Sequence, residues 1–301
     1  MAAAIETHGL TKTYSGDVRA VAGLDLRVKA GEVFGYLGPN GAGKSTTIRM
    51  LLDLIHPTAG HALVLGLDTR RNSVEARRHL GYLPGDLRLN DRMTAREQLD
   101  SLTRLRGSVD AGVRDRLCER FGVVLDRRIR QLSKGNRQKV GVVQAFMHRP
   151  QLVILDEPTS GLDPLLQAEF RSLVRETAGE GRTVFLSSHS LDEVQHVADR
   201  IGIIRGGRLV DVDAVERLRE RALRHVAIVF DEAAEAGPFE RLDGVRVEGA
   251  DGKTLRLSAP ERAMDGIVKE AARHPVVDLV SQPADLEELF LELYEEKPDG
   301  G

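Results

Sequence analysis

The sequence predicts an α/β fold built on a mixed, mainly parallel sheet. Apolar runs over residues 33–37, 152–155 and 183–187 have the length of short buried strands, and helical patterns separate them. Strands that alternate with helices in this way form a parallel sheet that the helices cover. Alternating patterns near residues 5–10 and 20–28 predict a smaller antiparallel sheet at one edge.

A glycine-rich segment joins the first of these strands to a helix. Residues 38–46 read Gly-Pro-Asn-Gly-Ala-Gly-Lys-Ser-Thr, which matches the whole pattern G-x-x-x-x-G-K-[ST]. The glycines let the backbone approach phosphate oxygens, and the helix that follows directs its positive end at the same place. Lys44 can reach the β- and γ-phosphates, and the Ser45 hydroxyl can ligate Mg²⁺. The pattern predicts a nucleoside triphosphate site, the phosphate loop, formed by Gly38, Pro39, Asn40, Gly41, Ala42, Gly43, Lys44, Ser45 and Thr46.

An acidic pair, Asp156 and Glu157, follows the apolar run at residues 152–155. A carboxylate at the end of a buried parallel strand beside a phosphate loop suits a second Mg²⁺ contact, usually through water, and we assign this role to Asp156. Glu157 points elsewhere and can polarise an attacking water as a general base. An isolated acidic pair would be a solvated strand end, but its combination with the phosphate loop favours the catalytic interpretation.

Composition limits the alternatives. The 301 residues suffice for one large domain and one small one, and a formal net charge of −3 with charges of both signs gives no large basic surface for nucleic acid. The single cysteine, Cys118, cannot form an internal disulfide and fits a reducing compartment. Its helical spacing with Leu117 and Phe121 predicts a place in the core.

The chain contains no apolar stretch of the roughly 18 residues that a membrane span needs. Its N-terminus lacks the basic start and the long apolar core of a secretion signal. Activity at a membrane would therefore depend on another polypeptide. The chain also has one phosphate loop and no internal repeat, so a single nucleotide site per chain predicts a pair of chains.

Three further segments complete a recognisable order. Residues 132–136 read Leu-Ser-Lys-Gly-Asn at the start of a helix, residues 160–163 read Ser-Gly-Leu-Asp, and His189 follows the run at 183–187. With the phosphate loop and the acidic pair, this order over residues 4–215 resembles the nucleotide-binding subunit of an ABC transporter. The resemblance implies the fold class: α/β, a P-loop NTPase core of the ABC ATPase type with an antiparallel edge sheet and a helical subdomain, plus a small α+β C-terminal domain.

The segment at residues 132–136 resembles the family's signature, which usually reads Leu-Ser-Gly-Gly-Gln. Lys134 and Asn136 depart from that pattern, whereas Ser133 and Gly135 agree with it. A hydroxyl and a small residue at a helix N-terminus can bind an anion. The resemblance implies that Ser133 and Gly135 meet ATP held by the opposite subunit.

The resemblance assigns further roles around the nucleotide. Tyr14 corresponds to the aromatic residue that stacks on adenine, a contact of about 1–3 kcal/mol. His189 corresponds to the histidine that contacts the γ-phosphate and helps to hold Glu157. Asp163 corresponds to the acid that bridges to the other protomer. The catalytic set is then Glu157, His189 and Lys44, with Ser45 and Asp156 as the Mg²⁺ ligands.

One position departs from the family more seriously. After residues 80–84 the family usually carries a glutamine that touches Mg²⁺ or water and links the site to the membrane partner. This chain has Gly85 and Asp86 there. Asp86 could supply an oxygen from one position later along a different backbone path, so the sequence leaves the role of this pair open.

The resemblance divides the chain into an ATPase domain over residues 1–217, with a helical subdomain at about 86–150, and an α+β accessory domain over 218–301. Strand patterns at 226–230, 245–247, 254–257 and 276–280, with a helical pattern over 261–273, describe the second domain. Its ending resembles the extension of bacterial ABC-2 type drug- and antibiotic-export ATPases, and a generic stabilising cap that also dimerises is the alternative. The ending contains Pro283, Leu286, Glu287, Leu289 and Phe290.

The implied function is the ATP-hydrolysing subunit of an ABC exporter that uses ATP and Mg²⁺. It would lie at the cytoplasmic face of the cell membrane, pair with a second copy or a homologous ATPase, and power efflux of a drug, antibiotic or lipid-like compound through a separate permease. Import is a less favoured direction. The alternative is a soluble ABC ATPase acting on a ribosome or nucleic-acid complex. Such proteins normally carry two nucleotide sites or a long coiled coil, and this chain has neither.

Overall fold

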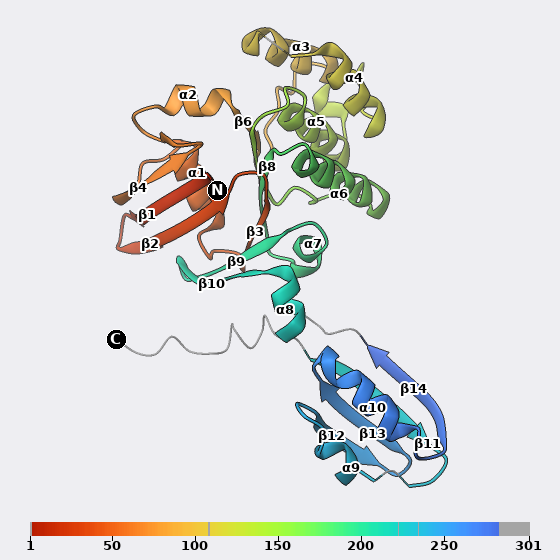
Figure 1. Ribbon diagram of the computed structural model, residues 1–301. Coiled ribbons are helices and arrows are strands. Elements are labelled where there is room, and N and C mark those ends of the chain that lie inside the picture. The colour runs from red at the N-terminus through yellow and green to blue at the C-terminus, as the bar shows by residue number, and fades with distance from the viewer. Residues whose placement is uncertain (1, 108, 222, 234, 283–301) are drawn as a thin grey trace. The chain divides into compact units, whose positions relative to one another are not determined.

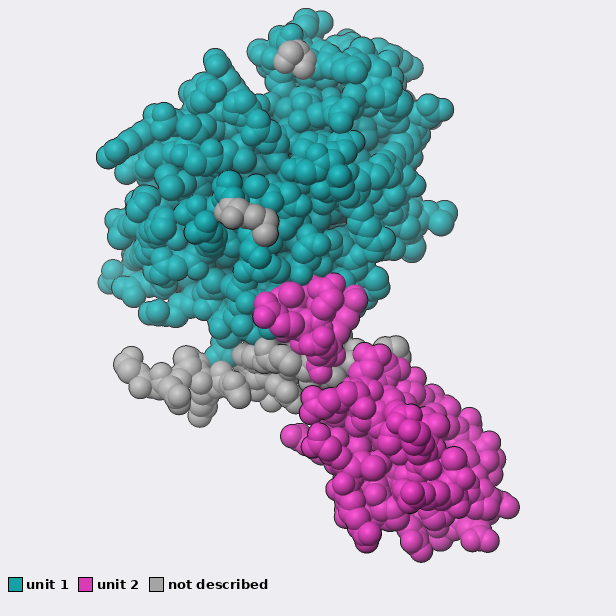
Figure 2. Space-filling view, viewed as in Figure 1, with its two compact units in different colours: residues 1–213 teal, residues 214–301 magenta. Residues whose placement is uncertain are grey.

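The computed structural model describes residues 2–107, 109–221, 223–233 and 235–282. The chain divides into two compact units, Met1–Asp213 and Ala214–Gly301, which Figure 2 shows in different colours. The domain boundary expected after residue 217 falls inside helix α8 (Val215–Arg221), the first element of the second unit.

A six-stranded sheet forms the centre of the first unit, with the strand order β10-β9-β3-β8-β7-β6 (Figure 1). Its pairs from β9 to β6 are parallel. Every residue of β3, β7 and β8 is buried, because helices cover both faces of a parallel sheet. These three strands confirm the prediction made from the apolar runs of the sequence. The strands are β3 (Val33–Leu37), β6 (Leu80–Leu83), β7 (Leu152–Asp156), β8 (Thr183–Ser188), β9 (Arg200–Arg205) and β10 (Arg208–Ala214).

A second, antiparallel sheet with the order β2-β1-β4-β5 confirms the predicted edge sheet. Helix α1 (Lys44–Leu51) shares one buried cluster with both sheets, in which Leu24, Ile48 and Phe185 are each 1% exposed or less. The helix that follows the phosphate loop is therefore anchored in a core that both sheets share. The strands are β1 (Ala3–Tyr14), β2 (Val18–Lys29), β4 (Ala59–Val64) and β5 (Leu67–Asp68).

Helices between β6 and β7 make up the segment predicted as a helical subdomain. Figure 1 shows α3, α4 and α5 gathered on the opposite side of this unit from β1, β2 and β4. Side chains of Thr94, Asp110 and Ser133 cap the starts of these helices. Cys118 is buried in α4, as its helical spacing predicts. The helices of the unit are α2 (Ser73–Arg78), α3 (Ala95–Arg106), α4 (Ala111–Arg120), the 3₁₀ turn η1 (Ile129–Gln131), α5 (Lys134–Phe146), α6 (Pro164–Gly179) and α7 (Leu191–Gln195).

The second unit is an α+β fold with an antiparallel sheet in the order β12-β13-β11-β14. Val226, Leu255 and Ile267 belong to its own buried cluster. The expected ending at Pro283, Leu286, Glu287, Leu289 and Phe290 lies outside the described residues. The elements after α8 are β11 (Arg224–Phe230), α9 (Gly237–Glu240), β12 (Arg246–Asp251), β13 (Thr254–Ala259), η2 (Glu261–Ala263), α10 (Met264–Ala271) and β14 (Val276–Gln282).

Among the helices described, none combines the length and the apolar character needed to cross a bilayer.

Close packing between β3 and α7 gives a test of the core. A Cβ atom at Gly35 would lie 2.0 Å from Cγ1 of the buried Val194. We expect Gly35→Ala to lower the free energy of unfolding by about 1–3 kcal/mol, because a well-packed core resists added volume. Urea unfolding of the full chain measures this change. Gly179→Ala is the matched control, because Gly179 ends α6 with nothing within 4 Å of its added Cβ. It should be neutral or stabilising, and equal losses in both variants would contradict the packing argument.

Candidate nucleotide-binding site

The backbone of the phosphate loop requires glycine at several positions. Gly41 and Gly43 have φ of 83° and 108°, a left-handed region that other residues rarely adopt. A Cβ at Gly43 would lie 2.4 Å from the carbonyl oxygen of Ala20, and one at Gly38 would lie 2.4 Å from that of Ile204. The loop therefore fits closely between β2 and β9, which holds its backbone in place.

A cavity of ≈ 190 Å³ opens over this loop. Every predicted loop residue except Gly38 and Ala42 lines it, together with Ala20 and Glu157. Backbone N–H groups at a helix N-terminus and a nearby ammonium group suit a bound phosphate. The lining residues are Ala20, Pro39, Asn40, Gly41, Gly43, Lys44, Ser45, Thr46 and Glu157.

Lys44 is 6% exposed and directs its ammonium group at oxygen atoms. Its Nζ donates to the carbonyl oxygens of Gly38, at 2.5 Å, and Pro39, at 3.1 Å. The same Nζ lies 3.4 Å from Oε1 of Glu157 in an ion pair. A positive charge surrounded by oxygens is the setting in which phosphate oxygens can replace the local acceptors.

Glu157 connects the phosphate loop to His189. Nδ1 of His189 lies 2.7 Å from Oε2 of Glu157, and because a carboxylate oxygen accepts, the histidine donates this hydrogen bond. Oε1 of Glu157 is buried and accepts no hydrogen bond from the residues that the structure describes. A buried carboxylate oxygen with free acceptor capacity fits a water molecule that donates to it. The backbone of Glu157 has φ of 49°, so the chain turns at the end of β7 and separates this side chain from Asp156.

Asp156 is 5% exposed at the end of β7, and its Oδ1 accepts a hydrogen bond of 2.5 Å from Oγ of Ser187. Burial and the charge of Asp156 raise the pKa of Tyr82 to about 12, so this neighbouring phenol stays neutral. A buried carboxylate and the Ser45 hydroxyl in the cavity wall are oxygen donors of the kind that Mg²⁺ prefers. The donor set therefore fits Mg²⁺.

The departure from the family at residues 85 and 86 has a clear geometry. An added Cβ at Gly85 would lie 3.4 Å from Oδ2 of Asp156, so the position faces the acidic pair without a side chain of its own. Oδ2 of Asp86 instead accepts from Nε and Nη2 of Arg88, at 3.0 and 2.9 Å. Asp86 is 72% exposed in this pair. The carboxylate of Asp86 is thus engaged by a neighbouring arginine.

The signature segment packs against the loop that follows Glu157. Oγ of Ser133 caps helix α5. Nζ of Lys134 donates to Oγ of Ser160 over 3.0 Å, and a Cβ at Gly135 would lie 2.6 Å from the carbonyl oxygen of Gly161. Among the described residues that line the 190 Å³ cavity, neither Ser133 nor Gly135 is found. Within one chain, the signature segment therefore does not line this cavity.

Tyr14 and Asp163 lie outside the cavity lining. Tyr14 ends β1 at the turn into β2, 41% exposed, with Nζ of Lys12 5.3 Å from its ring centroid. The next strand supplies Ala20 to the cavity. Oδ1 of Asp163 caps α6 by accepting from the N–H of Leu166 at 3.0 Å.

The sequence analysis missed Glu193, a residue of helix α7. Its Oε2 accepts from Oγ of Ser188 over 2.7 Å, and its Oε1 accepts from the hydroxyl of Thr159. Ser188 precedes His189, and Thr159 follows Glu157 by two positions. The available signal was a glutamate in the first turn of the helix after His189, which by itself indicates nothing more than a favourable helix charge.

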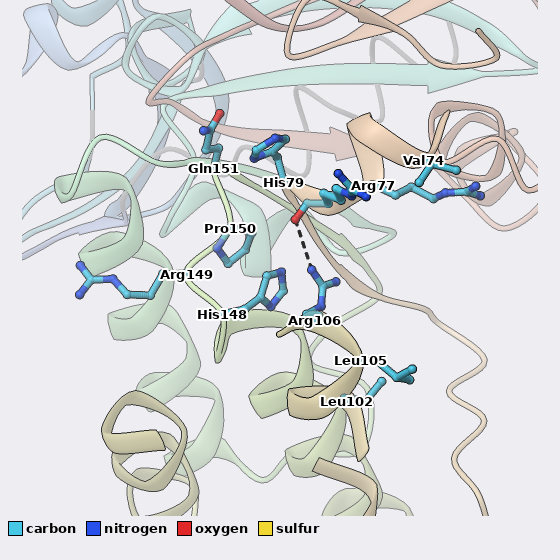
Figure 3. A pocket seen from close by; sticks show the side chains of 11 residues that line it. Val74, Arg77, His79, Leu102, Leu105, Arg106, His148, Arg149, Pro150 and Gln151 are labelled. Atoms are coloured by element: carbon cyan, nitrogen blue, oxygen red, sulfur yellow. Dashed lines mark hydrogen bonds between the residues drawn. The ribbon is translucent and has the colours of Figure 1, made fainter. Parts of the chain in front are cut away.

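A second cavity, of ≈ 1060 Å³, lies between α2, the end of α3 and the segment joining α5 to β7 (Figure 3). Arg106 donates to the carbonyl oxygens of Arg78, the dashed line of Figure 3, and of Leu80. Burial lowers the pKa of Arg106. Burial and the charge of Arg106 lower the pKa of His148 to about 4, and its Nε2 donates to the Leu80 carbonyl over 3.0 Å. This cavity shares no lining residue with the 190 Å³ cavity among the residues described.

Comparison with known proteins gives a consistent result. The ABC transporter family model matches residues 21–160. The daunorubicin resistance ATP-binding protein DrrA3 of Streptomyces coeruleorubidus is 36% identical over 303 residues, covering 96% of this chain and 95% of that protein. The probable multidrug ABC transporter ATP-binding protein YbhF of Escherichia coli (strain K12) is 39% identical over 211 residues, 68% of this chain and 36% of that longer protein. A solved ATP binding subunit of an ABC transporter superposes with a TM-score of 0.65 at 29% identity, covering 72% of this chain and 92% of the other.

The partly buried His148 predicts an acid sensitivity of folding. The pKa of His148 is about 4 in the folded chain, against an ordinary 6.5. Above pH 6.5 the free energy of unfolding therefore does not change with the titration of His148. It falls as the pH drops from 6.5 towards 4, because the unfolded chain then binds a proton that the folded chain refuses. The loss should be on the order of 1–3 kcal/mol, allowing for partial exposure of the ring.

His148→Gln keeps an N–H donor for Leu80 and removes the titrating group. We expect a smaller loss of unfolding free energy between pH 6.5 and 4.5 than in the wild type, measured by urea unfolding. The difference between the two proteins at pH 8 gives the packing effect of the substitution itself. An identical pH dependence in both would contradict the assignment.

Proposed function

Because the chain belongs to the family of ABC transporter ATP-binding proteins, we propose that it is the ATP-hydrolysing subunit of an exporter. It powers efflux of a drug, antibiotic or lipid-like compound through a separate membrane permease. The observation that carries the chemistry is the position of Glu157, whose carboxylate lies 2.7 Å from His189 and 3.4 Å from Lys44 at the wall of the cavity.

The residues of this chain divide the work of hydrolysis. N–H groups of residues 38–46 and the Lys44 ammonium bind the phosphates, while Tyr14 stacks on the adenine. Ser45 and Asp156 would hold Mg²⁺, which would neutralise negative charge on the phosphates. Glu157 accepts a proton from the attacking water at Oε1, which accepts no hydrogen bond from the described residues, and His189 holds Oε2 in position and contacts the γ-phosphate.

Two chains, or this chain and a homologous ATPase, enclose the nucleotides. The support is that Ser133 and Gly135 are not among the described residues that line the cavity of their own chain. In the pair, they contact the γ-phosphate bound by the other protomer, and Asp163 lies at the same interface. Such contacts exist only in the closed pair, so ATP favours closure through its differential affinity for the two states.

The names of the relatives support a permease partner. The full-length match carries the name of a daunorubicin resistance protein, and the longer match that of a probable multidrug transporter. We assign the permease contact to the helical subdomain at residues 86–150, which places the chain at the cytoplasmic face of the membrane. The ribosome- or nucleic-acid-associated alternative is not favoured, because these relatives are named as transport and resistance proteins.

Lys44→Ala tests the phosphate loop. Loss of a charge-assisted contact to phosphate should weaken ATP binding by about tenfold or more, since such contacts contribute about 1.5–3 kcal/mol. Fluorescent-nucleotide titration of the purified chain measures the dissociation constant. Lys269→Ala, at a lysine 75% exposed in the second unit, is the matched control and should bind as the wild type does. An unchanged affinity in Lys44→Ala would remove the loop from the site.

Glu157→Gln tests the general base. The amide keeps the shape of the carboxylate but cannot accept the proton, so ATP should still bind while steady-state phosphate release falls by about 10²–10⁴-fold. Glu240→Gln, at an exposed glutamate of α9, should retain wild-type turnover. Equal turnover in Glu157→Gln and wild type would exclude Glu157 as the base.

The same variant tests the transport assignment. With ATP and Mg²⁺ present, Glu157→Gln should hold its closed pair, and affinity purification from native membranes followed by mass spectrometry should recover a multi-span membrane protein. Recovery of ribosomes or DNA-bound complexes without a membrane protein would overturn the exporter function and leave the ATPase.

A further inference from the structure

We propose that Glu193 is a positioning residue for hydrolysis: its carboxylate joins the loop that carries Glu157 to the loop that carries His189, and so sets the distance between base and histidine. This inference deepens the proposed function and rests on it. It concerns a residue that is not among the described residues lining the nucleotide cavity.

The two oxygens of the Glu193 carboxylate bind two different loops. Oε2 accepts from Oγ of Ser188 over 2.7 Å, and Oε1 accepts from Oγ1 of Thr159. Ser188 is adjacent to His189, and Thr159 lies two residues after Glu157. Both hydroxyl-bearing residues are buried, Ser188 at 0% and Thr159 at 7% exposure. Hydrogen bonds from neutral hydroxyls to a carboxylate are short and strong, so the bridge restrains both loops at once.

The Ser188 end of this bridge also reaches the phosphate loop. The carbonyl oxygen of Ser188 accepts from the N–H of Gly38 at 3.2 Å, and its Oγ accepts from the N–H of Ser190 at 3.0 Å. The same residue therefore contacts Glu193, the turn into α7 and the first residue of the phosphate loop. A displacement of Ser188 would change the position of His189 relative to the phosphates as well as to Glu157.

Helix α5, which begins at the signature segment, binds the residue before Thr159. Nε2 of Gln138 in α5 donates over 2.8 Å to the carbonyl oxygen of Pro158, and Gln138 is 5% exposed. Glu193 and Gln138 thus bind neighbouring residues of one loop from opposite helices. The loop after Glu157 is therefore hydrogen-bonded to both α5 and α7. The bond to Glu193 of α7 is the one that connects this loop to Ser188 and His189.

Helix α7 provides a firm support for this carboxylate. Val194 is 0% exposed and packs so closely on β3 that a Cβ at Gly35 would lie 2.0 Å from it. The Ser190 side chain caps the helix by accepting from the N–H of Glu193. A carboxylate on a capped, well-packed helix can fix the distance between two loops, whereas one on a mobile segment could not.

The bridge acts on the chemical step because the base and the histidine must meet at hydrogen-bond distance. Nδ1 of His189 lies 2.7 Å from Oε2 of Glu157. A shift of about 1 Å in a reacting group can lower the rate on the order of 10²-fold. Lys44 binds the phosphate loop directly, through the carbonyl oxygens of Gly38 and Pro39, and these contacts do not involve Glu193. Loss of the bridge should therefore lower kcat and leave ATP affinity nearly unchanged.

The simpler role for Glu193 is a favourable negative charge in the first turn of α7. Asp192 has the same charge in the same turn and is 70% exposed. It is the matched control, because Asp192→Ala removes a helix-terminal charge without touching Thr159 or Ser188. A role limited to the helix dipole predicts similar effects for both substitutions, whereas the bridge predicts a loss of turnover in Glu193→Ala alone.

The experiment uses the full chain with steady-state phosphate release, fluorescent-nucleotide titration and thermal melting. We expect Glu193→Ala to lower kcat by about tenfold or more with an ATP dissociation constant within about twofold of wild type. Glu193→Gln should recover most of the turnover, because its amide oxygen accepts from one hydroxyl and its N–H donates to the other. Asp192→Ala should match the wild type in both quantities.

Substitutions at Thr159 keep the test decisive if Glu193→Ala does not fold. Thr159→Val removes the hydroxyl at nearly constant shape and should lower kcat, while Thr159→Ser keeps the hydroxyl and should not.

The outcomes separate this inference from the proposed function. Turnover in wild type, none in Glu157→Gln and wild-type kcat in Glu193→Ala would overturn the role of Glu193 alone. A fall of kcat in proportion to ATP affinity or to folded fraction, without recovery in Glu193→Gln, would also overturn it. Absence of ATP hydrolysis by the wild type in the presence of its permease would overturn the proposed function, and this inference with it.

Discussion

The carboxylate of Glu157 is the contact on which the site depends, because it joins three parts of the chain that are far apart in sequence. Lys44 lies on one side of it and His189 on the other, at 3.4 and 2.7 Å. Charges of opposite sign and a donated hydrogen bond hold its orientation, while Oε1 keeps acceptor capacity for a further donor. A left-handed backbone at this residue, with φ of 49°, is the conformational cost of presenting the side chain in this way.

Close packing around the phosphate loop and helix α1 supports this arrangement. The phosphate loop has no room for side chains at Gly38 or Gly43, and α1 shares one core with both sheets of its unit. Asp156 is fixed by Ser187 on the neighbouring strand. Groups that must act together are thus positioned by strands and helix starts, where the backbone has few alternatives. The second unit has a hydrophobic core of its own, so its stability does not depend on the geometry around Glu157.

Sequence reasoning reached the parts of the fold and the site that local patterns encode. Apolar runs predicted β3, β7 and β8, and the phosphate loop motif predicted the residues around the smaller cavity, since both depend on residue order alone. Glu193 was missed because its partners Thr159 and Ser188 approach it only after β7 and β8 pair. The bond from Lys134 to Ser160 was missed for the same reason, since side-chain partners that are distant in sequence leave no periodic signal.

The strand order β3-β8-β7 has a consequence for how the site comes into being. β8 lies between the strand that leads to the phosphate loop and the strand that ends in the acidic pair, and parallel neighbours are about 4.8 Å apart. His189, at the carboxyl end of β8, is therefore the geometric midpoint of the site. Pairing of these three adjacent strands places Glu157, His189 and the phosphate loop at one edge of the sheet. The part of the proposed catalytic site that one chain supplies is in this sense a product of the strand order itself.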